Sequence, residues 1–222
     1  VLTADVGAVQ GTTHIAIGNG PTYIHGGAGN ISVDTTWTAC AGPYIVEELV
    51  TVQAGVTLTV EAGTVMQFNT GTGIQVSGAL TATGQSTNMV LFTSNGSYWP
   101  GSWYGLAFGD NSNAGSGALE YVTVEYAGQW NCAWPNTGWC DSAAVLVYNG
   151  GSPDITNSVI RNNNGYGLYL RNGAQTIQEN LIQANNNWGI YAEPNSLPTI
   201  STNTVSANGN GGVYLQSQSG LN

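Results

Sequence analysis

The chain has 222 residues, of which 41% are hydrophobic, 6% are charged and 32 are glycine. Disordered chains are poor in hydrophobic residues and rich in charge, so this composition indicates a packed domain. The formal net charge is −10, and Arg161 and Arg171 are the only lysine or arginine residues. We expect no nucleic-acid partner, because phosphate binding requires a basic face. No apolar run approaches the roughly 20 residues of a membrane helix, so we also expect no membrane insertion.

The first 30 residues lie outside the repeats found further along the chain, but they contain strand-like pieces at residues 13–17 and 22–24. We expect residues 1–30 to form an N-terminal extension to a repeat domain over residues 31–222. The extension either caps the first coil of its own chain or adds a strand to a neighbouring molecule. Its candidate contact residues are Ile15, Ile17, Tyr23 and Ile24.

Short segments that alternate apolar and polar residues follow, as half-buried strands do. They lie at residues 55–60, 73–76, 90–92 and 105–108. An insertion at about residues 128–142 is rich in Trp, Pro, Asn and Gly, and it contains Cys132 and Cys140. We expect these two cysteines to form a disulfide, which leaves Cys40 over and favours an oxidising compartment. The alternative is three reduced thiols.

The C-terminal third of the chain is repetitive. Four matching segments begin at residues 144, 167, 189 and 212, so their starts are 23, 22 and 23 residues apart. Two further columns keep the same phase: Ile155, Ile177 and Ile200, and then Asn163, Asn185 and Asn208. A fixed period near 22 with short β-rich pieces and Gly/Asn turns predicts a solenoid in which each repeat is one coil. We expect about seven coils, with the asparagines forming a ladder inside them.

Four segments carry a resemblance to a known architecture: residues 52–64 (VQAGVTLTVEAGT), 91–94 (LFTS), 101–103 (GSW) and 119–122 (LEYV). Through them, the chain from residue 37 to 208 resembles the right-handed parallel β-helix repeat proteins of bacterial secreted and surface proteins, the pectin-lyase-like architecture. The resemblance implies an all-β fold, a right-handed parallel β-helix (solenoid) with coils of roughly 22 residues in its regular part. This architecture hosts lyases, hydrolases, adhesins and inert spacers, so it does not decide the function.

No catalytic constellation of the related enzymes is found in the sequence. Polygalacturonases of this fold carry a close Asp pair and a Gly-His-Gly element, whereas Asp110, Asp141 and Asp154 are dispersed here. The lyases use an arginine or lysine base beside a calcium-binding Asp cluster. The loop at residues 109–115 has the composition of a calcium loop but only one carboxylate, and calcium sites usually need more charge. We expect no enzymatic activity and no cofactor, with calcium at this loop as the alternative.

Both arginines have a structural interpretation. In the repeat alignment Arg161 lies one coil above Glu125, and Arg171 lies between Tyr148 and Glu193. We expect both arginines to be surface staples between adjacent coils, each contributing about 0–1 kcal/mol.

Aromatic residues are the remaining functional signal. Tyr169, Tyr191 and Tyr214 each follow an inward-facing residue by one position, so they should form a ladder on the outer face of one sheet. The tryptophans of the insertion are expected beside this face: Trp130, Trp134 and Trp139. Such a surface suits sheet stabilisation, lateral protein packing or glycan binding.

The final coil is incomplete in the sequence, with no charged cap after the strand at residues 212–215. An open edge that carries Val213 and Leu215, together with a spare N-terminal strand, favours head-to-tail self-association. We therefore predict a non-catalytic structural protein, extracellular or at the cell surface after removal of a signal peptide, that forms a filament or surface layer with itself. The alternative is a polysaccharide-binding or polysaccharide-processing module that uses the tyrosine face. Asn30 and Asn95 lie in glycosylation sequons.

Overall fold

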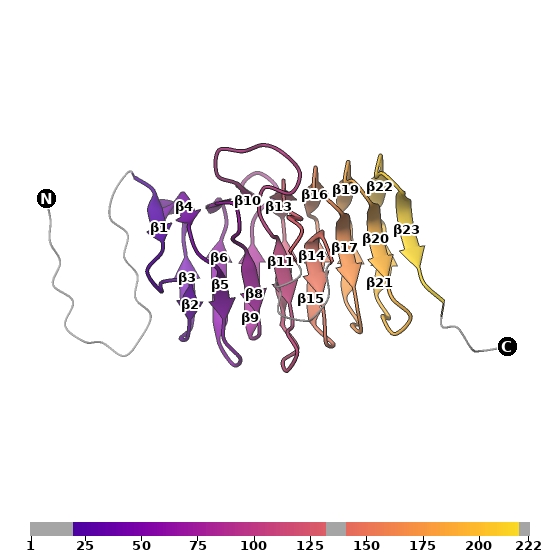
Figure 1. Ribbon diagram of the computed structural model, residues 1–222, viewed down its shortest axis with the longest axis horizontal. Helices are drawn as coiled ribbons and strands as arrows, with labels where there is room; N and C mark the ends of the chain where they lie inside the picture. Colours follow the sequence, from indigo (N-terminus) through magenta and orange to yellow (C-terminus); the bar gives the residue numbers. More distant parts are fainter. Residues whose placement is uncertain (1–19, 132–140, 218–222) are drawn as a thin grey trace, which may run out of the picture.

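The computed structural model describes residues 20–131 and 141–217. The strands form three parallel sheets, and the chain visits the sheets in the same order in every turn, so each turn is one coil of a solenoid. The coils stack along the long axis of the molecule, and the chain advances from one end of the stack to the other (Figure 1). No helix in the described part of the chain is long and apolar enough to cross a membrane.

Each sheet takes one strand from each coil, except that the last described coil gives none to the third sheet, and neighbouring strands within a sheet are parallel. The first sheet contains β1 (Thr22–Ile24), β4 (Tyr44–Val46), β7 (Val65–Phe68), β10 (Val90–Ser94), β13 (Val122–Glu125), β16 (Val159–Arg161), β19 (Leu181–Gln183) and β22 (Thr204–Ser206). The second sheet contains β2 (Asn30–Ile31), β5 (Val50–Val52), β8 (Ile74–Val76), β11 (Leu106–Phe108), β14 (Ala143–Val147), β17 (Tyr166–Leu170), β20 (Trp188–Ala192) and β23 (Gly211–Leu215). The third sheet contains β3 (Thr35–Trp37), β6 (Thr57–Glu61), β9 (Ala79–Thr83), β12 (Ser116–Glu120), β15 (Ser152–Thr156), β18 (Thr176–Gln178) and β21 (Thr199–Ser201). A short 3-10 helix, η1 (Ala39–Ala41), connects β3 to β4.

Columns of apolar side chains fill the space between the three sheets. In the second sheet Leu106, Val145, Leu168 and Ile190 are in register across four successive coils. All four are fully buried. Burial of each such side chain stabilises the fold by roughly 1.5–3 kcal/mol. The period of the sequence therefore becomes a continuous core, because residues one repeat apart lie directly above one another.

An asparagine ladder lines the corner between the first and second sheets. Asn163 Nδ2 donates to Asn185 Oδ1 at 2.8 Å, and Asn185 Nδ2 donates to Asn208 Oδ1 at 2.9 Å. The same two oxygens accept the backbone N–H groups of Asn163 and Asn185. Asn163 and Asn185 are buried. The ladder therefore satisfies polar groups that the corner removes from water.

A second ladder, which we did not predict, lines the corner between the third and first sheets. Asn180 Nδ2 donates to Asn203 Oδ1 at 2.9 Å, and Asn180 Oδ1 accepts the backbone N–H of Ser158 at 2.9 Å. The residues before these asparagines, Glu179 and Thr202, have φ angles of 59° and 54°. Residues other than glycine rarely adopt this left-handed backbone conformation. The hydrogen bonds of the ladder therefore hold the corner in an unfavourable backbone geometry.

The first coil of the described chain begins inside the segment that we expected to be an extension. Thr22–Ile24 forms β1 and pairs with β4 of the same chain, and Ile24 is buried in the core. Tyr23 and Ile24 are therefore part of the solenoid and not a spare strand for a neighbouring molecule. Ile15 and Ile17 lie outside the described residues.

Candidate functional site

Three tyrosines stack on the outer face of the second sheet. The ring centroids of Tyr169 and Tyr191 are 5.3 Å apart with an interplanar angle of 3°, and those of Tyr191 and Tyr214 are 5.2 Å apart at 14°. Rings arranged in this way cover one another's faces, and Tyr214, at the end of the described stack, is 41% exposed. Tyr169 is also buried, at 4% exposure, which corrects the expectation that all three form an exposed face. The stack joins neighbouring coils but offers little ring face to a ligand.

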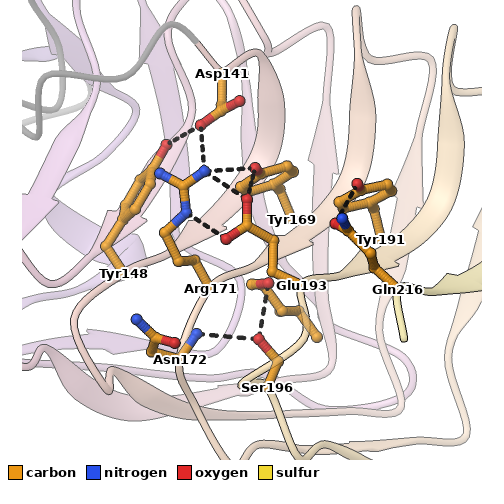
Figure 2. Close-up of polar contacts among 10 residues, drawn as sticks. Asp141, Tyr148, Tyr169, Arg171, Asn172, Tyr191, Glu193, Ser196 and Gln216 are labelled. Atoms are coloured by element: carbon orange, nitrogen blue, oxygen red, sulfur yellow. Dashed lines mark hydrogen bonds and ion pairs between the residues drawn. The ribbon is translucent and has the colours of Figure 1, made fainter. Parts of the chain in front are cut away.

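Arg171 organises a polar cluster beside this stack (Figure 2). Its Nε donates to Glu193 Oε2 at 2.7 Å, its Nη2 donates to Glu193 Oε1 at 2.5 Å, and Nη2 also donates to the Tyr169 hydroxyl at 2.9 Å. Asp141 Oδ2 lies 3.9 Å from Nη2 and accepts a hydrogen bond from the Tyr148 hydroxyl at 3.1 Å. These five residues are named the Arg171 cluster below. Arg171 joins adjacent coils through Glu193 as expected, but its side chain is only 14% exposed, so it does so from a largely buried position and not at the surface.

The pKa values of the two carboxyl groups in the Arg171 cluster are shifted in opposite directions. Burial raises the pKa of Asp141 above its ordinary value, although the charge of Arg171 and the Tyr148 hydroxyl act against that rise. Burial would also raise the pKa of Glu193, but hydrogen bonds from Arg171 and Tyr169 lower it below its ordinary value. Glu193 is thus a firmly ionised partner of Arg171, whereas the charge of Asp141 is poorly compensated.

Arg161 forms a separate ion pair on the first sheet. Its Nε and Nη2 each lie 2.9 Å from Glu125 Oε2. Glu125 Oε1 accepts a hydrogen bond from Thr93 at 3.1 Å, so this outer face links three successive coils. The Arg161 side chain is 43% exposed and the pair is correspondingly weak, because water screens its attraction.

An open pocket of about 370 Å³ lies beside the Arg171 cluster. This volume is within the range of small-molecule sites. Trp130 forms one wall and is 71% exposed, so, unlike the tyrosines, it presents an indole to solvent. The lining residues are Trp130, Asp141, Ser142, Asn164, Gly165, Tyr166 and Asn187.

Hydrogen bonds to neighbouring coils orient the polar groups of the pocket. Asn187 Oδ1 accepts the backbone N–H of Trp188 at 3.0 Å and the Nδ2 of Asn210 at 2.6 Å. Asn164 Oδ1 accepts from Asn186 Nδ2 at 3.1 Å. Asp141 differs, because its Oδ1 makes no hydrogen bond to any described residue and only Oδ2 is engaged (Figure 2). This carboxylate oxygen is therefore available to a donor on a ligand.

The pocket combines one predicted residue with several that we had not identified. Trp130 was predicted as part of an aromatic face. We had set aside Asp141 as an isolated carboxylate. We had not singled out Tyr166 or Asn187 at all. Their shared signal is position, because each lies at the start of a second-sheet strand or one or two residues before it. Cys132, Trp134, Trp139 and Cys140 lie outside the described residues, and Cys40 is an exposed free cysteine.

In the loop considered for calcium, the one carboxylate is engaged by groups of the protein itself. The Asp110 carboxylate accepts hydrogen bonds from the Ser77 hydroxyl at 2.5 Å and from the backbone N–H groups of Ser112 and Asn113 at 2.6 and 2.7 Å. Two of these bonds lie within the turn of Asp110, and the third ties that turn to Ser77 of the preceding coil. Over residues 20–131 and 141–217, no group of three or more His, Cys, Asp or Glu side chains is placed to hold a metal ion.

Comparison with known proteins agrees with the architecture. Residues 143–222 match the model of a family described as a right handed beta helix region. No curated protein and no solved structure matches the chain. The family match and the three parallel sheets together identify a right-handed parallel β-helix.

Proposed function

We propose that this right-handed parallel β-helix binds a glycan, without cleaving it, in the pocket between Trp130 and Asp141. The observation that carries the proposal is an exposed indole in the same pocket as an available carboxylate oxygen and oriented amides. A sugar ring has an apolar face and a rim of hydroxyl groups, so it is matched by one aromatic ring and several polar groups. The stacked tyrosines support the wall of this site and are not its binding face.

Binding without cleavage is favoured by the state of the carboxylates. Glycoside hydrolysis requires two carboxyl groups that face each other across the scissile bond. Both oxygens of Glu193 are engaged by Arg171, and Oε1 also accepts from Tyr169. Among the described lining residues, Asp141 is then the one that carries a carboxylate. A glycan-binding role also agrees with a location outside the cell or at its surface, where polysaccharides are accessible.

The proposal is tested by titrating the protein with neutral and amino-sugar oligosaccharides and comparing two tryptophan variants. Trp130→Ala removes the aromatic wall, and we expect binding to weaken at least about fivefold, taking about 1–3 kcal/mol for a ring stacked on an aromatic side chain, as for stacked bases. Trp99→Ala is the matched control, because Trp99 is 76% exposed and does not line the pocket. Equal losses in both variants, or none in either, would contradict the proposal.

A second candidate function is head-to-tail self-association. In the described chain β21, β22 and β23 are each the last strand of their sheet, so their outer edges have no strand neighbour. Val213 and Leu215 on β23 are 41% and 62% exposed. Unpaired edges template the addition of further strands, and contacts between the two different ends of a rod propagate into filaments.

Electron microscopy and sedimentation of the purified protein test this second candidate. Leu215→Lys places a charge on the exposed edge without removing a core side chain, so it should shorten or abolish any polymer. Tyr98→Lys is the control, because Tyr98 is 66% exposed on the flank between β10 and β11. Monomeric rods of the unmodified protein at high concentration would rule out self-association.

A further inference from the structure

We propose that the ligand of the Trp130 pocket is an amino sugar, whose protonated amine pairs with Asp141, and that the pocket rejects acidic sugars. This inference rests on the proposed function and adds the chemical class of the glycan. It follows from the charges around the pocket.

The charged groups of the Arg171 cluster, with Asp141 included, sum to one negative charge. Asp141 and Glu193 contribute two carboxylates, and Arg171 contributes one guanidinium that is already bound by both oxygens of Glu193. The remaining polar neighbours in the Arg171 cluster are the hydroxyl groups of Tyr148 and Tyr169, and Tyr166 faces the pocket beside them. Arg171, 3.9 Å from Asp141 Oδ2, therefore compensates the charge of Asp141 only in part, and Asp141 Oδ1 offers a hydrogen-bond acceptor to the pocket.

No other cation of the described surface is available to neutralise this charge. Arg161, the second of the two Lys or Arg residues in the chain, is bonded to Glu125 on the first sheet. His25 lies near Glu47, in the first coils of the solenoid. With a formal net charge of −10, the whole molecule repels a polyanion. A uronic acid or sulfated sugar would bring a second negative charge to Asp141, whereas an ammonium group would supply the missing positive one.

The aromatic wall provides the other half of the recognition. The indole of Trp130 can cover the apolar face of a sugar ring, and an aromatic ring also attracts a nearby ammonium group through its π face. Trp130 and Asp141 line the same pocket, so one ring could contact both. The pocket thus differs from a site for an acidic glycan, in which arginine or lysine would be expected.

The test is calorimetric titration with the tetramers of glucosamine, N-acetylglucosamine and galacturonic acid. The buffer is held at about pH 6, below the pKa of an amine, so that the glucosamine amines are protonated. We expect the glucosamine tetramer to bind roughly tenfold or more tightly than the N-acetyl tetramer, because a charged hydrogen bond is stronger than a neutral one, and the galacturonate tetramer not to bind measurably. Asp141→Asn should remove the difference between the first two sugars, while Trp130→Ala should weaken both. The melting temperatures of both variants verify that they are folded.

Three outcomes are distinguishable. Loss of the amine preference in Asp141→Asn supports the inference. Equal binding of the amine and N-acetyl tetramers, or tighter binding of galacturonate, with sensitivity to Trp130→Ala, overturns the amino-sugar assignment but leaves glycan binding intact. If none of the three sugars binds, or binding is insensitive to Trp130→Ala, then the proposed function fails and the inference fails with it.

Discussion

Arg171 and Glu193 form a two-point ion pair between successive coils, with Nε 2.7 Å from Oε2 and Nη2 2.5 Å from Oε1. The pair lies on the outer face of the second sheet, where Arg171 also touches Tyr169 and approaches Asp141. Its geometry uses up both oxygens of one carboxylate and leaves Asp141 as the carboxylate that lines the pocket. The Arg171–Glu193 ion pair therefore makes Asp141, and not Glu193, the acidic group that can bind a ligand.

We predict that Glu193→Gln destabilises the protein by about 2 kcal/mol, because a largely buried guanidinium loses its charged partner. Urea denaturation at neutral pH measures the change. Glu61→Gln is the control: Glu61 is exposed on β6, and its substitution should change the free energy of unfolding by less than about 0.5 kcal/mol. Equal effects of the two substitutions would show that the ion pair is not stabilising.

The same pair predicts a pH dependence. The folded-state pKa of Glu193 is lowered, since hydrogen bonds from Arg171 and Tyr169 outweigh the effect of burial. A carboxyl group of this kind stabilises the fold fully above its ordinary pKa and loses that contribution as the pH falls through the lowered one. Glu193→Gln should therefore cost most at neutral pH and progressively less in acid. A difference between wild type and variant that is constant down to acid pH would contradict this assignment.

Asp141 should behave in the opposite way, because burial raises its folded-state pKa. A raised carboxyl pKa means that ionisation is less favourable in the folded state, so its contribution to stability falls as the pH rises through the ordinary value towards the raised one. We predict that Asp141→Asn is tolerated at neutral pH and that its stability relative to wild type rises between acid and neutral pH. Thermal unfolding over this pH range measures the trend, and a severe loss at neutral pH would contradict it.

We predict that Asn185→Ala destabilises the protein by about 2–4 kcal/mol. Asn185 is buried, and its removal takes away the hydrogen bonds that its side chain makes to the backbone N–H of Asn163 and to the carbonyl of Ile160. Asn186→Ala is the neighbouring control, because the hydrogen bond of Asn186 to Asn164 is exposed and should contribute less than about 1 kcal/mol. Comparable losses in the two variants would show that the buried ladder does not stabilise the corner.

The sequence predicted the repeated features of the fold because repetition is visible as a period. Leu168 and Ile190 recur one repeat apart in the sequence and lie in register in the second sheet. Residues 22–24 were recognised as strand-like but were not assigned to the repeat domain, although β1 lies one regular period of 22 residues before its partner β4.

The candidate site could be predicted only in part, because most of it is built from contacts that occur once. The ring orientation and burial of Tyr169 depend on Arg171, Tyr166 and Tyr191, which surround it in three dimensions. Asp141 reaches the pocket from the end of the insertion, where no repeat column constrains its position. Composition identified aromatic residues as the functional signal, but only the packing shows that Trp130 is open and that the tyrosines are stacked.

The most direct test of glycan binding at Trp130 is a nuclear magnetic resonance titration that follows the indole N–H signals of the tryptophans. The signals of Trp130 and Trp99 are assigned from single substitutions to Phe, and the glucosamine tetramer is then added. We expect the Trp130 signal to shift in a saturable manner and the Trp99 signal to remain in place. An unchanged Trp130 signal at saturating sugar, or equal shifts of both signals, would contradict the account.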